Sequence, residues 1–106
     1  MSRVEKKLKS LRKKIDQADR DLLRALGNRQ ATVARIGKLK ARAGIAAHQK
    51  SRWAEVIRER RKLGRKRGLG AEFTEAVFTL IHAEALRIQK RIPRPKSKNK
   101  PTPRKR

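Results

Sequence analysis

The stretch ALGNRQATVARIGKLK, residues 25–40, continues a helical pattern but places two cations on its apolar side. Upstream, apolar residues recur every three or four positions, the spacing of one face of an α-helix. They are Val4, Leu8, Leu11, Ile15, Ala18, Leu22, Ala25 and Leu26. The same spacing then reaches Arg29, Val33, Ile36 and Lys40. The presence of an arginine and a lysine on the apolar face of this helix needs a physical explanation.

The pattern predicts an all-α fold with three helices per chain, one long and two shorter. The expected bounds are about Val4 to about Ala41, Gln49 to about Lys66, and about Ala71 to Arg91. Gly44 would stop the first helix and Pro93 the third. We therefore expect one helical domain over residues 1–92. Residues 93–106 are basic and poor in apolar side chains, which predicts a disordered tail.

The unequal lengths of the helices predict pairing between two chains. At 1.5 Å per residue the first helix would be ~57 Å long, and the others only ~27 Å and ~32 Å. The shorter helices have apolar sides of their own, on Trp53, Val56, Ile57, Arg60 and Leu63 and on Phe73, Val77, Leu80, Ile81, Glu84 and Ile88. They cannot cover the long stripe alone, and an exposed stripe would be sticky. We expect an intertwined homodimer, with a simple coiled-coil dimer as the plainer alternative.

The composition limits the partners without choosing one. The 33 basic residues against 9 acidic ones give a net charge of +24, which would attract nucleic acid, an anionic membrane or a small anion. With no cysteine, disulfides and cysteine-based metal sites are excluded, and we expect no metal or cofactor. Aromatic residues are too few for a base-stacking platform. No signal-peptide-like or membrane-spanning apolar run is evident, so we expect a cytoplasmic protein without a membrane partner.

The two cations on the apolar face, Arg29 and Lys40, allow two interpretations. Burying an unpaired cation is costly, so Arg29 and Lys40 need partners or a function. On one helix they would differ by only ~20° in direction and lie ~16 Å apart, so they could converge on a small polyanion. Alternatively they extend to solvent, or pair with Glu55, Glu59 or Glu84.

Two segments share motifs, in order and spacing, with a known family. These are LRKKIDQADRDLLRALGNRQATVARIGKLK, residues 11–40, and HQKSRWAEVIRERRKLGRKRGLGAEFTEAVFTLIHAEALRIQ, residues 48–89. Together they resemble the all-helical class of chorismate mutase. The combination of Gln49, Arg52 and Trp53 with a later His-x-Glu resembles a bacterial subgroup of that class. The resemblance implies an intertwined dimer that converts chorismate, a dicarboxylate, to prephenate without a cofactor or metal.

The resemblance also implies roles for individual residues. Arg29, Lys40, Arg52 and Gln89 would come from one chain, with Lys40 and Gln89 as donors to the breaking ether bond. Arg12 would come from the partner chain. Geometry agrees, because Arg12 and Arg29 lie ~25 Å apart on a straight helix and cannot grip one small molecule together.

Three positions depart from the usual family pattern. Gln49 replaces an Asp, Trp53 replaces a Glu that binds the substrate's ring hydroxyl, and Ala85 replaces a Ser beside the substrate. Gln49 and Glu84 could take over the hydroxyl contact, and Trp53 is either core or a pocket wall.

Other functions stay open from the sequence. An isochorismate pyruvate lyase would share the fold and the cationic clamp, and a basic helical nucleic-acid-binding protein would suit the charge. His48 and His82 have no further ligand candidates at metal spacing, so we expect His82 to pack or to bond to the backbone.

Overall fold

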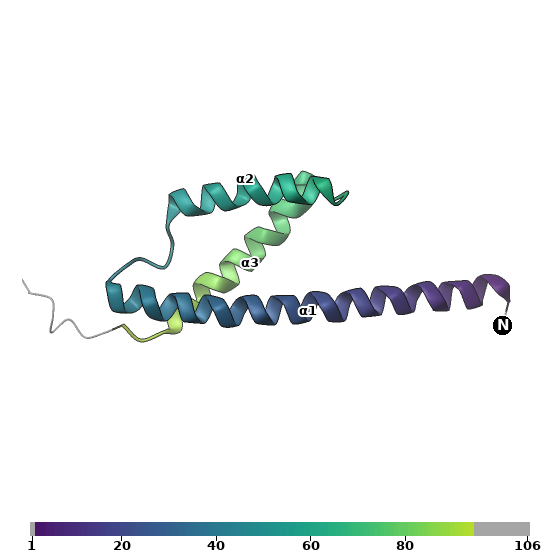
Figure 1. Ribbon diagram of the computed structural model, residues 1–106, viewed down its shortest axis with the longest axis horizontal. Helices are drawn as coiled ribbons and strands as arrows, with labels where there is room; N and C mark the ends of the chain where they lie inside the picture. The colour runs from purple at the N-terminus through teal and green to yellow at the C-terminus, as the bar shows by residue number, and fades with distance from the viewer. Residues whose placement is uncertain (1, 95–106) are drawn as a thin grey trace, which may run out of the picture. The chain divides into compact units, whose positions relative to one another are not determined.

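A computed structural model describes residues 2–94, which form three α-helices (Figure 1). They are α1 (Arg3–Ala43), α2 (Lys50–Lys66) and α3 (Ala71–Arg91). The predicted all-α class is confirmed, and the described residues contain no strand. Each helix lies within two residues of its expected bounds. Most of the predicted tail, from residue 95 onward, lies outside the described residues.

Local signals set both ends of α1. Ser2 and Glu5 form a reciprocal cap, in which the Glu5 amide donates to Ser2 Oγ at 3.0 Å and the Ser2 amide donates to Glu5 Oε1 at 2.8 Å. The hydrogen bond that the carboxyl of Glu5 accepts from the Ser2 amide is the main cause that lowers the pKa of this carboxyl. At the other end Gly44 has a φ of 72°, and the Ile45 amide donates a hydrogen bond to the Lys40 carbonyl at 2.8 Å. A glycine adopts this left-handed conformation without strain, so Gly44 ends the helix as predicted.

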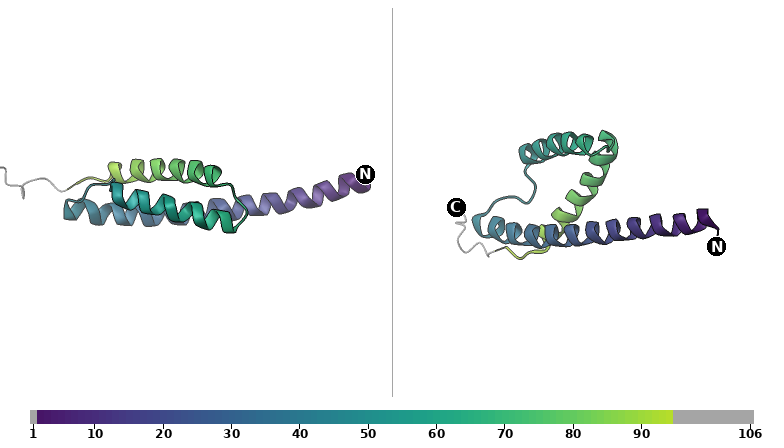
Figure 2. Two further views of the ribbon diagram at one scale, coloured as in Figure 1. Left: turned by 90° about the horizontal axis from the view of Figure 1, so that it is seen from above. Right: turned by 45° about the vertical axis from the view of Figure 1, so that its right-hand side comes forward.

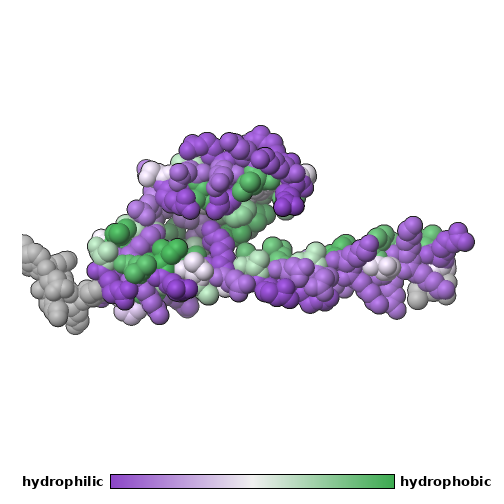
Figure 3. All heavy atoms as spheres, in the orientation of Figure 1, coloured by the Kyte–Doolittle hydropathy of each residue, from purple (hydrophilic) through white to green (hydrophobic). Residues whose placement is uncertain are grey.

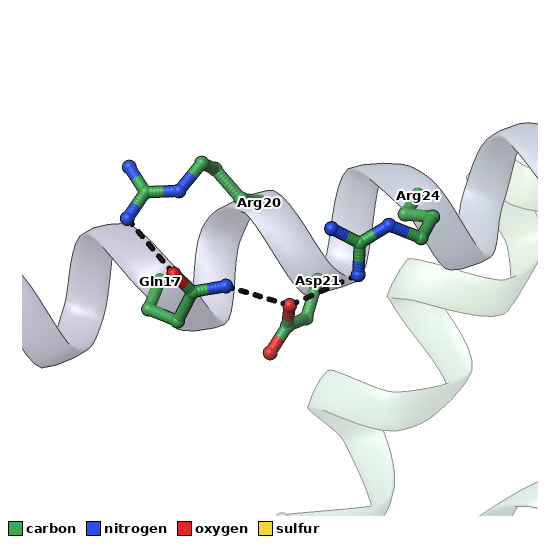
Figure 4. Close-up of polar contacts among 4 residues, drawn as sticks. All are labelled: Gln17, Arg20, Asp21 and Arg24. Carbon is green, nitrogen blue, oxygen red and sulfur yellow. Dashed lines mark hydrogen bonds and ion pairs between the residues drawn. The ribbon is translucent and has the colours of Figure 1, made fainter.

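The chain divides into two compact units, with the boundary between Thr32 and Val33 inside α1. In the first unit, hydrogen bonds and an ion pair join Gln17, Arg20, Asp21 and Arg24 on the exposed helix surface (Figure 4). Each such pair stabilises a helix by only about 0.2–0.5 kcal/mol. Six large apolar residues of this unit are 42% to 67% exposed, namely Val4, Leu8, Leu11, Ile15, Leu22 and Leu23, whereas Leu26 is half-buried. Apolar residues also appear along α1 in the space-filling view (Figure 3).

The second unit is held by two close helix contacts that depend on glycine. α2 and α3 meet near the turn that joins them and diverge from it (Figures 1 and 2). At that end a Cβ on Gly64 would lie 2.4 Å from Thr74 Oγ1. A Cβ on Gly37 would lie 2.6 Å from Ile92 Cδ1 and 3.0 Å from Gln89 Cγ. The absence of a side chain at Gly37 therefore lets the last third of α1 pack against the end of α3.

The core of the described chain is small. Its buried apolar residues are Val33, Ala41, Val56 and Ala85, and Thr74 is buried with them. Arg61 pairs with Glu75 between α2 and α3, and Arg60 lies over the Phe78 ring at 5.9 Å. No helix among the described residues is long and apolar enough to cross a membrane.

Some residues expected on the inner sides are exposed instead. Phe73 is 59% exposed, Leu80 is 73% exposed and Leu63 is 47% exposed. Phe73 and Leu80 are seven residues apart and so share one face of α3. That face differs from the one that carries the buried Thr74. Residues 2–94 leave this face uncovered, which is the physical reason for the difference.

We expect Gly64→Ala to destabilise the second unit by about 1–3 kcal/mol, because the added methyl group overlaps Thr74. Chemical denaturation measures the effect. The control is Gly64→Ala combined with Thr74→Ala, which removes the overlapping Oγ1 and should recover part of the loss. Wild-type stability in Gly64→Ala alone would contradict the packing described here.

Candidate active site

The side chain of Lys40 joins three parts of the second unit. Its Nζ donates to the Ala47 carbonyl at 2.8 Å, in the loop between α1 and α2. It also donates to Gln89 Oε1 at 3.3 Å, near the end of α3. The structure thus brings together the two residues predicted to act on the ether bond, although they are 49 positions apart in the sequence.

Lys40 keeps its charge available to a ligand. The ammonium has three N–H donors, and the two acceptors above leave one of them for another partner. Neither acceptor is a carboxylate, so within residues 2–94 Lys40 forms no ion pair with Glu55, Glu59 or Glu84. The side chain is half-buried, and this desolvation lowers its pKa below the ordinary value for lysine. A half-buried cation without a carboxylate partner attracts an anion more strongly than a fully solvated one does.

The hydrogen bond from Lys40 also fixes the amide of Gln89. Because Oε1 accepts from Lys40, the Nε2 group is left as a donor. Ala85 lies one turn earlier on α3 and is only 6% exposed. Residues four apart share a helix face, so Ala85 and Gln89 face the same way. The close packing at Gly37 sets the approach of this face to α1.

Arg52 and Gln49 lie at the start of α2. Gln49 is the N-cap residue, with extended backbone and no side-chain capping hydrogen bond, and it is exposed. Arg52 donates to Glu55 Oε1 at 3.1 Å, and both side chains are more than 60% exposed. Such a surface ion pair is worth about 0–1 kcal/mol. Arg52 can therefore leave Glu55 for a ligand carboxylate at little cost.

Glu84 is held on the surface of α3 by Arg87. Arg87 Nε donates to Glu84 Oε1 at 2.8 Å, and a second guanidinium nitrogen contacts the other carboxylate oxygen. The hydrogen bond from Arg87 lowers the pKa of Glu84, so the carboxylate stays ionised and can act only as an acceptor. Its predicted contact with a ring hydroxyl stays a prediction.

The two remaining predicted residues lie in the first unit. Arg12 is exposed on α1, and Arg29 is half-buried on the same helix. Arg29 and Lys40 belong to different units, and their convergence on one ligand stays a prediction.

Two features of the second unit were not found from the sequence. The first is the Ala47 carbonyl, a backbone group that no residue pattern marks. The second is a ring cluster in which His48 Nδ1 lies 3.1 Å from His82 Nε2, and His82 stacks on Trp53 with ring centres 4.0 Å apart. The sequence predicts packing for His82, and it does pack, but its histidine partner is 34 positions away. Residues 2–94 hold no group of three or more side chains suited to a metal ion.

Comparisons with known proteins identify the family of the chain. The family described as chorismate mutase type II matches residues 11–90. A bifunctional chorismate mutase/prephenate dehydratase of Aquifex aeolicus is 33% identical over 89 residues, covering 80% of this chain and 24% of that protein. A T-protein of Haemophilus influenzae is 33% identical over 78 residues, and one of Enterobacter agglomerans is 32% identical over 78 residues. Both matches cover 74% of this chain and 21% of the T-protein.

The chain thus spans about a quarter or less of these curated relatives. No solved structure gives a significant match. The family match, however, includes Arg12, Arg29, Lys40, Arg52 and Gln89 in a single aligned region. The chain belongs to the chorismate mutase type II family.

Proposed function

We propose that this chain is a chorismate mutase, an isomerase that rearranges chorismate to prephenate in aromatic amino acid biosynthesis. The family match supports this activity, and the observation that carries it is the Lys40–Gln89 hydrogen bond. This bond leaves one N–H of the ammonium and the NH₂ of the neighbouring amide as donors. Neither isochorismate cleavage nor nucleic-acid binding is favoured by the relatives.

The reaction needs placement of charge rather than a chemical group from the protein. One C–O bond breaks and one C–C bond forms within a single molecule, so no nucleophile, acid or base takes part. As the ether bond breaks, its oxygen gains negative charge. The remaining donors of Lys40 and Gln89 would meet that charge, and a preorganised donor of this kind is worth about 10²–10³ in rate.

The arginines would hold the substrate in its reactive shape. Chorismate carries two carboxylates, and a guanidinium can bind a carboxylate through two parallel hydrogen bonds. Arg29 and Arg52 would bind from the same chain as Lys40, and Arg12 from a partner chain. Fixing both carboxylates folds the molecule so that its reacting ends meet, which removes much of the entropic barrier.

We infer an intertwined homodimer, in which the partner supplies Arg12. The exposed apolar residues on the first part of α1 support this, since a second copy would remove them from water. We also infer membership of the subgroup with Gln49, Arg52 and Trp53, with Gln49 and Glu84 near the ring hydroxyl. A cytoplasmic location stays a prediction.

We expect Lys40→Ala and Gln89→Ala each to lower the turnover of chorismate by about 10²–10³, because each removes a donor to the ether oxygen. The matched controls Lys38→Ala and Lys90→Ala change neighbouring exposed cations and should retain activity, as should deletion of residues 93–106. The assay follows prephenate from chorismate, with isochorismate as the competing substrate. Turnover of isochorismate to salicylate and pyruvate, with none of chorismate, would contradict the proposal.

Mixing two inactive variants tests the shared site. Arg12→Ala and Lys40→Ala, co-expressed or refolded together, should regain about a quarter of wild-type activity, because half of the dimers then hold one intact site of two. Each variant alone is the control. If the mixture stays as inactive as its components, Arg12 does not come from a partner chain.

A further inference from the structure

The loop between α1 and α2 carries an acceptor that sets the position of Lys40. This loop, residues 44–49, includes Ala47, whose carbonyl accepts the shorter of the two hydrogen bonds from Lys40. A short loop without secondary structure moves readily unless something holds it. If the Ala47 carbonyl moves, the ammonium of Lys40 moves with it or loses its partner. Whatever fixes this loop therefore bears on the charge at the site.

The histidine pair supplies such an anchor. His48 directly follows Ala47, and its Nδ1 lies 3.1 Å from Nε2 of His82 on α3. One ring donates and the other accepts, which a pair of neutral histidines can satisfy. His82 is itself fixed by stacking on Trp53, with an angle of 13° between the rings. Trp53 is in the first turn of α2, so His82 connects α3 to both the loop and the helix that follows it.

We propose that His82 is a positioning residue for the rearrangement, acting through His48 and the Ala47 carbonyl on the ammonium of Lys40. This proposal rests on the proposed function, because it assigns His82 a place in the same site. His82 touches no reacting atom in this account. Its contribution is to keep the ammonium where the ether oxygen gains charge, so its loss lowers kcat more than it raises KM.

Two substitutions separate the hydrogen bond from the stacking. His82→Phe keeps a flat ring against Trp53 but cannot bond to His48, whereas His82→Gln places an amide near the former Nε2. We expect His82→Phe to lower kcat by roughly 3- to 10-fold, the effect of one lost hydrogen bond, with KM within about twofold. His82→Gln should recover most of the rate. Amide hydrogen exchange at Ala47 and His48 should speed up in His82→Phe and return towards the wild-type rate in His82→Gln.

Substitution of His48, the hydrogen-bond partner of His82, tests whether the loss of kcat comes from this bond or from other contacts of His82. His48→Leu should reproduce the kcat loss of His82→Phe, and the double variant should be no worse than either single one. If kcat and loop exchange stay at wild-type values in His82→Phe, or if the two losses add, the positioning role is overturned. Failure of the proposed function looks different. The wild-type protein would then not turn over chorismate, while the loop exchange would still respond to His82→Phe.

Discussion

The half-buried ammonium of Lys40 is the constraint on which the site depends. Its burial disfavours the charge, and within the described residues no carboxylate compensates for it. Two neutral acceptors satisfy it only in part, and they come from different elements of the fold. A charge in this setting gains more from an incoming anion than a charge exposed to water does. Close packing at Gly37 and the stop at Gly44 place the elements that create this environment.

The exposed apolar surface of the described residues, like the unequal lengths of the helices, is consistent with pairing between two chains. The first part of α1 exposes an unbroken stripe, and α3 exposes Phe73 and Leu80. At about 25 cal/mol per Å², such surface is costly to leave in water. The described core is small, and all four of its buried apolar residues are valine or alanine. Both observations are consistent with a second chain, which would also bring Arg12 to the site in the account proposed here.

Much of the fold could be predicted from the sequence because its signals are local. The spacing of apolar residues predicts the helices, while Gly44 and Pro93 mark two of the ends. The pairing of Lys40 with Gln89 was reached only through family resemblance, since no local pattern connects residues so far apart. The Ala47 carbonyl and the His48–His82 bond were missed for the same reason. The exposure of Phe73 and Leu80 was missed because helical periodicity shows which residues share a face but not whether the same chain covers it.

Gln89 is proposed to donate to the ether oxygen beside Lys40, and the pH dependence of kcat in Gln89→Glu tests this role. A protonated carboxyl group can still donate a hydrogen bond, but an ionised one can only accept and would repel the developing charge. We expect the variant to be active at acid pH and to lose about 10² in rate as its carboxyl ionises, whereas the wild-type amide has no such transition. If kcat of the variant follows the wild-type profile across this range, Gln89 does not donate to the ether oxygen.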